Sequence, residues 1–319
     1  MGPLEGIRVV EMAGIGPAPF CAMLLADMGA KVIRVDRLSP SGLGVDFAPE
    51  HDLLNRGKRS VAVDLKLPEG VTTVRKLIGQ ADVLIEGFRL GVMEKLGLGP
   101  NSFEAENPQL VFGRMTGWGQ SGPLAAAAGH DINYIAITGV LHSIGRADAP
   151  PTVPLNLVGD FGGGSLYLAL GILAAVIEAR QSGRGQVVDS AIVDGVANLL
   201  TFAHGMQQAG QMTLERGRNL IDSGAPFYDV YETRDARYVA VGAVEPKFFL
   251  TLCEGMGLSP AHLPPQYEQA RWPELREIFA TRFREKTSAE WCALLEGTDA
   301  CFAPVLDMIE AAAHPHNVA

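Results

Sequence analysis

Three ionisable side chains lie at junctions between predicted elements, where a side chain can reach a ligand. His130 follows a loop of small residues and precedes an apolar helix, Asp160 precedes three glycines, and Glu245 separates an apolar strand from a helix. A histidine and two carboxylates in such places indicate acid–base chemistry, with free N–H groups at a helix start facing developing negative charge. A structural interpretation stays open for each: Asp131 caps the helix beside an incidental His130, and Asp160 and Glu245 are N-caps.

Basic residues gather in the first third of a chain that is acidic as a whole. Lys and Arg number 26 and Asp and Glu 36, a net charge of −10, which argues against partners such as nucleic acid or an anionic membrane. A solvated face is the usual role of such residues, but a positive patch on an acidic chain favours a phosphate site for a nucleotide-like ligand. The residues are Arg34, Arg37, Arg56, Lys58, Arg59 and Arg89, densest in NRGKRS at 55–60.

A glycine-containing loop at 14–19, GIGPAP, lies between the first predicted strand and helix. The dinucleotide-binding pattern would place glycine at 14, 16 and 19, and Asp36 stands where a ribose-binding acid would lie. Pro19 replaces the third glycine, so a tight turn is favoured over an NAD-dependent oxidoreductase. The four cysteines have no CxxC spacing and form no Cys/His cluster, so we expect no metal site and buried, reduced thiols.

The predicted elements place these residues on an α/β fold. Short β-branched runs alternate with helices over the first part of the chain, which is typical of a doubly wound, Rossmann-like domain with a parallel sheet. A β-hairpin and three helices after Gly224 indicate a smaller α+β domain, and 319 residues suit about two domains. The predicted strands are 7–10, 31–35, 60–65, 82–86, 110–114, 227–232 and 237–241, and the helices 20–28, 69–78, 92–96, 131–143, 162–181, 190–209, 246–257, 273–285 and 288–296. The longest strongly apolar run, Leu166 to Ile177, is too short to span a bilayer.

Several long segments together resemble the class III CoA-transferase family (CaiB/BaiF type), and within it the α-methylacyl-CoA racemase branch. The similarity runs from about residue 4 to the chain end. The segments are GIRVVEMAGIGPAPFCAMLLADMGAKVIRVDR (6–37), NRGKRSVAVDLK (55–66), GHDINYIAITGVL (129–141), GDFGGGSLYLALGILAA (159–175) and GAPFYDVYETRDARYVAVGAVEPKFF (224–249).

The resemblance implies an isomerase that interconverts (R)- and (S)-2-methylacyl-CoA through an enolate. By resemblance, His130 serves one face of the α-carbon and Asp160 the other, and Glu245 pairs with His130. The backbone N–H of Asp131 would face the enolate oxygen. Coenzyme A would be held by Arg37, Arg59, Arg89 and Ile15, with no cofactor beyond the CoA of the substrate and no metal.

Three other functions stay open beside the racemase. A class III CoA-transferase would use Asp160 as a nucleophile, but has no obvious need for His130 and Glu245. An NAD-dependent oxidoreductase conflicts with Pro19, and a non-catalytic CoA-binding protein conflicts with the complete set of ionisable residues. The acyl group is left open, from short 2-methyl acids to sterol side chains and 2-arylpropionyl groups.

The family also implies an assembly and a domain plan. Two chains are expected to interlock as a homodimer that acts in fatty-acid metabolism. The ending NVA is not a peroxisomal signal such as SKL, so a cytoplasmic location is expected. The expected plan is a large CoA-binding domain at 1–189, a linker helix region at 190–224, a small α+β domain at 225–303 and the start of a return linker at 304–319. Family members usually continue beyond the position of Ala319, so the chain is expected to be short at this end.

Overall fold

The computed structural model describes residues 2–39, 42, 44–45 and 48–319. Two compact units divide the chain, and each is described by itself. The first comprises Met1–Leu141 and Val153–Phe202, and the second His142–Thr152 and Ala203–Ala319. Residues 190–202 of the expected linker thus group with the first unit in this division, while the domain boundaries themselves stay predictions.

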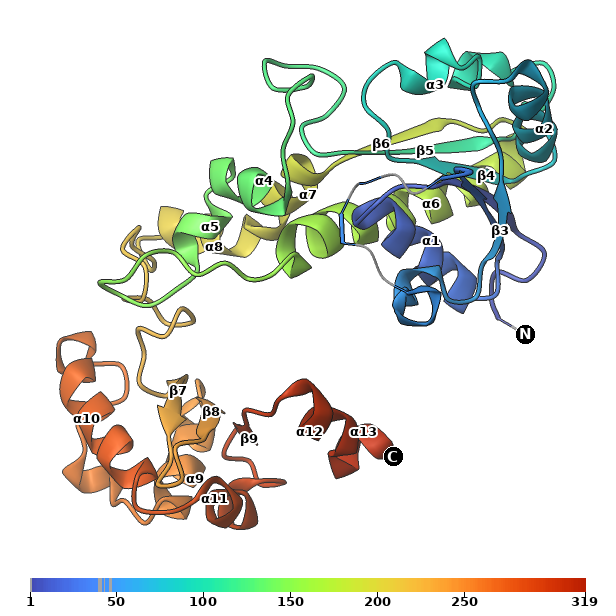
Figure 1. The fold of residues 1–319 in the computed structure, drawn as a ribbon. Helices are drawn as coiled ribbons and strands as arrows, with labels where there is room; N and C mark the ends of the chain where they lie inside the picture. Colours follow the sequence, from blue (N-terminus) through green and yellow to red (C-terminus); the bar gives the residue numbers. More distant parts are fainter. Residues whose placement is uncertain (1, 40–41, 43, 46–47) are drawn as a thin grey trace. The chain divides into compact units, whose positions relative to one another are not determined.

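The first unit contains a six-stranded parallel sheet, which confirms the α/β prediction (Figure 1). The strands lie in the order β3-β2-β1-β4-β5-β6 and are all parallel. The chain adds β2 and β3 on one side of β1 and then β4, β5 and β6 on the other, so the strand order changes direction between β1 and β4. Loops after the carboxyl ends of these two strands diverge, and this is where open α/β sheets bind ligands. The strands are β1 (Arg8–Met12), β2 (Lys31–Asp36), β3 (Arg59–Ala62), β4 (Val83–Glu86), β5 (Val111–Thr116) and β6 (Val187–Ala191).

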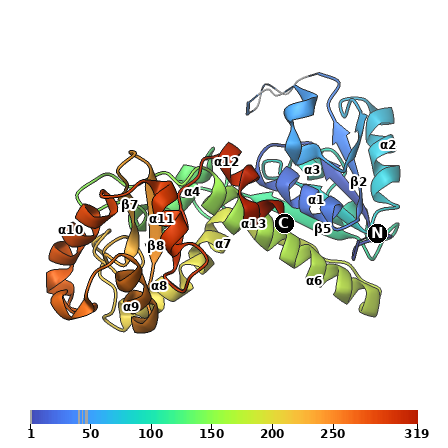
Figure 2. The same ribbon diagram turned by 90° about the horizontal axis from the view of Figure 1, so that it is seen from below.

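Helices cover both faces of this sheet, as its apolar strands require. Helices α1 (Pro17–Asp27) and α6 (Leu166–Ser182) lie side by side on one face, which Figure 2 views from below. Helices α2 (Pro68–Ile78) and α3 (Val92–Lys95) lie on the other face, where Val10, Leu84 and Phe112 contribute to a buried cluster.

A glycine-rich π-helix, η4 (Leu157–Ser165), leads directly into α6. A Cβ atom on Gly163 would lie 2.4 Å from Val196 Cγ2, so glycine is what allows α7 (Ile192–Leu199) to pack closely on η4. The continuous stretch Leu157–Ser182 is 26 residues long and, by length and hydropathy, long enough to cross a membrane. The apolar run seen in the sequence is thus only part of a longer helical stretch. A helix in a protein core can be as long and as apolar as a membrane-spanning one. Within the first unit, α6 packs against β5 and β6, as a core helix does.

Two long helices predicted from the sequence are wrong in detail. The stretch 131–143 breaks at Gly139, which has a φ of +85°, into α4 (Asp131–Ile137) and α5 (Val140–Ser143). The start of 190–209 belongs to strand β6, and the rest divides into α7 and α8 (Thr201–Gln208). Strand β6 was missed because its pairing partner, β5, is distant in sequence.

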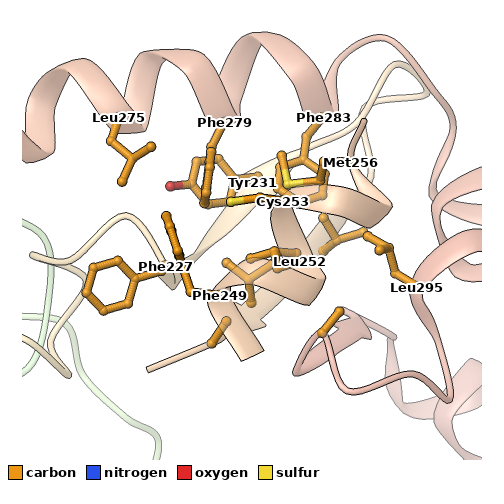
Figure 3. Close-up of a cluster of buried hydrophobic side chains, with 14 of the residues drawn as sticks. Phe227, Tyr231, Phe249, Leu252, Cys253, Met256, Leu275, Phe279, Phe283 and Leu295 are labelled. Atoms are coloured by element: carbon orange, nitrogen blue, oxygen red, sulfur yellow. The ribbon is translucent and has the colours of Figure 1, made fainter. Parts of the chain in front are cut away.

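The second unit is the predicted α+β structure. The hairpin of β7 (Tyr228–Glu232) and β8 (Tyr238–Gly242) is extended by β9 (Phe302–Pro304) into an antiparallel sheet. The core of this unit is an aromatic cluster that includes Phe227, Phe249, Phe279, Phe283 and Trp291, most of it drawn in Figure 3. The helices are α9 (Pro246–Gly255), α10 (Trp272–Phe283), α11 (Ser288–Leu295), α12 (Met308–Ala313) and α13 (Pro315–Val318).

Five short 3-10 turns connect the described helices and strands, and the cysteines lie in both units. The turns are η1 (Pro49–His51), η2 (Leu53–Asn55), η3 (Pro100–Ser102), η5 (Pro260–His262) and η6 (Gln269–Arg271). All four cysteines are free thiols; Cys21 and Cys253 are buried as expected, whereas Cys292 is half-buried and Cys301 exposed. The expectation of four buried thiols is therefore wrong for these last two.

Candidate active site

A cavity of about 370 Å³ opens at the carboxyl ends of the central strands in the first unit. His130 and Asp160 both line it, together with Arg89 and Ile15. A second cavity of about 410 Å³ shares Ile15, Gly87 and Phe88 with the first and is lined by Arg37. The fold thus brings five of the residues singled out in the sequence to one edge of the sheet.

His130 is exposed and immediately precedes α4, as its N-cap residue. Its backbone N–H donates to Asn133 Oδ1 at 3.0 Å, which fixes the start of the helix. Within the described chain, no acceptor takes the backbone N–H of Asp131, the first helical residue. This free donor is the one that the resemblance assigns to an enolate oxygen.

Asp160 lies in the first part of η4 and is partly buried. Burial raises the pKa of its carboxyl to about 6, against a lowering by Asn156, whose side chain donates to Oδ2 at 3.4 Å. A Cβ atom on Gly16 would lie 3.1 Å from the same oxygen, and Gly16 has a φ of +67°. Glycine therefore lets the loop after β1 approach this carboxylate. A carboxyl with a pKa of about 6 can both accept and release a proton near neutrality.

The basic cluster divides into paired and free members. Arg34 pairs with Asp36 at 3.2 Å, Arg56 with Asp27 at 2.6 Å and Lys58 with Glu11 at 2.7 Å. The Lys58 side chain is only 2% exposed, so the suggestion that it belongs to a surface phosphate patch is wrong. Arg37, Arg59 and Arg89, in contrast, make no ion pair with any carboxylate that the structure describes. Arg59 is exposed at the start of β3 and lines neither of the two cavities.

Glu245 lies in the second unit, at the residue before α9. Its carbonyl accepts the N–H of Phe249 at 3.0 Å, but its side chain makes no cap hydrogen bond and is exposed. A side-chain N-cap, the plain alternative, is therefore not what Glu245 provides. Its pairing with His130 stays a prediction.

Sequence reasoning missed three residues that shape the cavity. The Tyr134 hydroxyl donates to the carbonyl of Gly129 at 2.5 Å, and its ring packs edge-on against Trp118. This contact fixes the loop immediately before His130. Glu86 accepts the N–H of Phe88 at 2.7 Å and so braces the loop that carries Arg89. Glu86 could have been found in the sequence as the charged residue that ends the apolar strand VLIE. Tyr134 could have been found as the aromatic residue one helical turn after His130.

Comparison with known proteins decides the family. The family model for CoA-transferase family III matches residues 4–319. The chain belongs to this family. It is 51% identical to the alpha-methylacyl-CoA racemase of Mus musculus and 49% identical to that of Homo sapiens, each over 98% of this chain and 80% of the relative. A CAIB/BAIF family protein from Brucella suis has the same fold, with a TM-score of 0.83 at 27% identity over 99% of this chain and 87% of that structure.

More distant members of the family carry another activity in their names. The succinyl-CoA:glutarate CoA-transferase of Homo sapiens is 29% identical over 99% of this chain and 75% of its own length. The fold alone therefore does not separate the two kinds of chemistry, and the residues of the cavity must.

Proposed function

We propose that this chain is an α-methylacyl-CoA racemase, an isomerase that interconverts (R)- and (S)-2-methylacyl-CoA. The observation that carries the proposal is that His130 and Asp160 line the same cavity at the edge of the parallel sheet. Two relatives whose sequences are 51% and 49% identical to this chain bear this name, which supports the same reaction here.

The chemistry follows from the α-carbon of a thioester. Its two enantiomers present the α-proton on opposite faces, so two groups are needed, one for each face. One group takes the proton as the C–H bond breaks, the enolate forms, and the other group returns a proton to the opposite face. His130 and Asp160 exchange these roles when the direction reverses. The reaction changes no oxidation state, so we expect no redox cofactor. The backbone N–H of Asp131 would stabilise the enolate oxygen, so we also expect that no metal is required.

Coenzyme A would bind through the unpaired arginines. Arg37 and Arg89 line adjoining cavities and lack a described carboxylate partner, so their charge is available to phosphate groups. Arg59 and Ile15 complete the expected set, with Ile15 exposed at the boundary of both cavities.

The alternative is a CoA-transferase in which Asp160 attacks an acyl-CoA as a nucleophile. Its location in the cavity suits that role too, and family members such as the glutarate enzyme carry the name. His130 in the same cavity favours the racemase, because a carboxylate nucleophile needs no second proton-transfer group.

We also propose a cytoplasmic homodimer that acts in fatty-acid metabolism. Helices α6 to α8 expose several large apolar side chains, which a second copy would cover in preference to a membrane or nucleic acid. Four free cysteines agree with a reducing compartment. The exposed apolar residues are Leu166, Leu170, Ile177, Leu199 and Phe202.

One experiment separates the two activities. The protein is incubated with (R)-2-methyldecanoyl-CoA in D2O, with and without a free carboxylic acid. Deuterium at the α-carbon with loss of stereochemistry, independent of the acid, supports the racemase. Transfer of CoA to the added acid without α-exchange overturns it in favour of the transferase.

A further inference from the structure

The side chain of Asp131, as distinct from its backbone, reaches across to the element that carries Asp160. Its Oδ2 accepts the backbone N–H of Asp160 at 2.6 Å. The same carboxyl group also takes a hydrogen bond from the backbone N–H of Gly159. The residue is 7% exposed. A Cβ atom on Gly159 would lie only 2.3 Å from the same oxygen, so glycine at this position is what permits the contact.

These two N–H groups need an acceptor from outside their own helix. Gly159 and Asp160 lie in the first turn of η4, where a π-helix provides no carbonyl for them, since the residues five positions earlier precede the helix. A carboxylate is the acceptor best suited to donors at a helix start, because of its charge. The start of η4 is therefore held by a residue of α4.

We propose that the Asp131 carboxylate is a positioning residue that holds Asp160 opposite His130. This inference rests on the proposed racemase function. His130 and Asp131 are consecutive at the start of α4, so one short segment carries the first proton-transfer group and anchors the backbone of the second. The separation of the two groups is thereby set by two hydrogen bonds rather than by the long chain between them.

The negative charge of Asp131 and the burial of Asp160 both raise the pKa of the Asp160 carboxyl. Burial is the main reason that the pKa of Asp160 is raised, and the negative charge of Asp131 adds to it, whereas His130 lowers it. Tyr134, on the next turn of α4, also interacts with Asp160. The test below uses stereochemistry, so it does not depend on these shifts.

The experiment compares two rates that a racemase normally couples. Each enantiomer of 2-methyldecanoyl-CoA is incubated in D2O, and α-deuterium incorporation and racemisation are followed separately. In Asp131→Ala, Asp160 loses its anchor while His130 keeps its own, so one enantiomer should still exchange its proton while racemisation falls about 100-fold, the loss expected for a displacement near 1 Å. Asp160→Asn should show the same pattern.

Conservative and control variants separate positioning from folding. Asp131→Asn still offers an oxygen acceptor, that of its amide, to the same two N–H groups. Relative to Asp131→Ala, it should restore most of the coupling between exchange and racemisation. Gly159→Ala displaces the carboxylate from the other side and should uncouple exchange from racemisation even if Asp131→Ala does not fold. Asp194→Ala is the matched control, because it removes an exposed carboxylate from α7, another helix packed on η4. It should leave the ratio of exchange to racemisation unchanged.

Two results would overturn the positioning role. In one, exchange of both enantiomers falls in parallel with racemisation in folded Asp131→Ala and Gly159→Ala. In the other, Asp131→Asn behaves as Asp131→Ala does. A wild-type protein that neither exchanges nor racemises would instead overturn the proposed function, so the two failures are distinguishable.

Discussion

Replacing Lys58 with methionine should destabilise the first unit strongly, and more so at alkaline pH. Lys58 Nζ lies 2.7 Å from Glu11 Oε2, and their side chains are 2% and 0% exposed. The same ammonium donates to the carbonyl of Pro19 at 2.9 Å. The pair therefore connects β1, the start of α1 and the segment before Arg59. Methionine has a similar volume, so the variant removes the charge and its hydrogen bonds with little change in packing.

The magnitude follows from the charge that remains. Removing one partner of a buried ion pair costs about 3–5 kcal/mol, since the other charge stays buried and unpaired. Burial already raises the pKa of Glu11 from 4.5 to about 7, despite the lowering by Lys58. A carboxyl with a raised folded-state pKa stabilises the fold fully below pH 4.5 and loses this contribution as pH rises through about 7. Without Lys58 the pKa of Glu11 rises further, so we expect a loss of about 4 kcal/mol at pH 8 and of about 1–3 kcal/mol at pH 5.5, where the carboxyl is neutral.

The assay is the urea dependence of amide hydrogen exchange, read by mass spectrometry in peptides from β1 and β4. Peptides from β7 and β8 in the second unit serve as an internal reference. The double variant Glu11→Leu/Lys58→Met should recover to within about 1–2 kcal/mol of wild type, because no buried charge remains. Arg56→Met is the matched control, since its pair with Asp27 is exposed and little change is expected. Equal losses for Lys58→Met at both pH values, or no recovery in the double variant, would refute the reasoning.

Three further predictions concern the site and the second core. Because burial raises the pKa of Asp160 to about 6, kcat/KM for the enantiomer that it deprotonates should fall about tenfold per pH unit below pH 6; a profile that stays flat to pH 5 contradicts this. Arg89→Ala should raise KM for acyl-CoA about 10- to 100-fold through the loss of a charged hydrogen bond, with kcat little changed. The control Arg56→Ala should change neither KM nor kcat. A loss confined to kcat argues against phosphate binding by Arg89. Phe279→Ala, in the aromatic cluster of the second unit, should lower the free energy of unfolding of that unit by about 3–5 kcal/mol. Hydrogen exchange in β7 peptides measures this loss, and β1 peptides should stay unchanged. A loss spread evenly over both units contradicts two separate cores.

Local signals in the sequence were sufficient for much of the fold. The β-branched run before Gly14 and the one before Asp36 form β1 and β2, and the turn at 233–236 closes the hairpin of the second unit. The capping box of Thr287 and Glu290 starts α11. These features depend on neighbouring residues, so a sequence window contains the forces that produce them. The pairing of β6 with β5 depends on residues far apart in the chain, and the sequence pattern predicts a helix over the last two residues of that strand.

The site shows the same division between local and distant causes. The residue types and their long motifs predict that His130, Asp160 and a set of arginines belong to a CoA-linked acid–base site, and the fold brings His130, Asp160 and Arg89 to one cavity. Only the tertiary structure decided which basic residues are paired: Lys58 and Arg59 are adjacent, yet the side chain of Lys58 is buried against Glu11 whereas Arg59 is exposed. It also decided that Asp131 turns its carboxylate toward Asp160. The physical reason is that burial and pairing depend on what the fold brings within a few ångströms, and spacing along the chain does not contain that information.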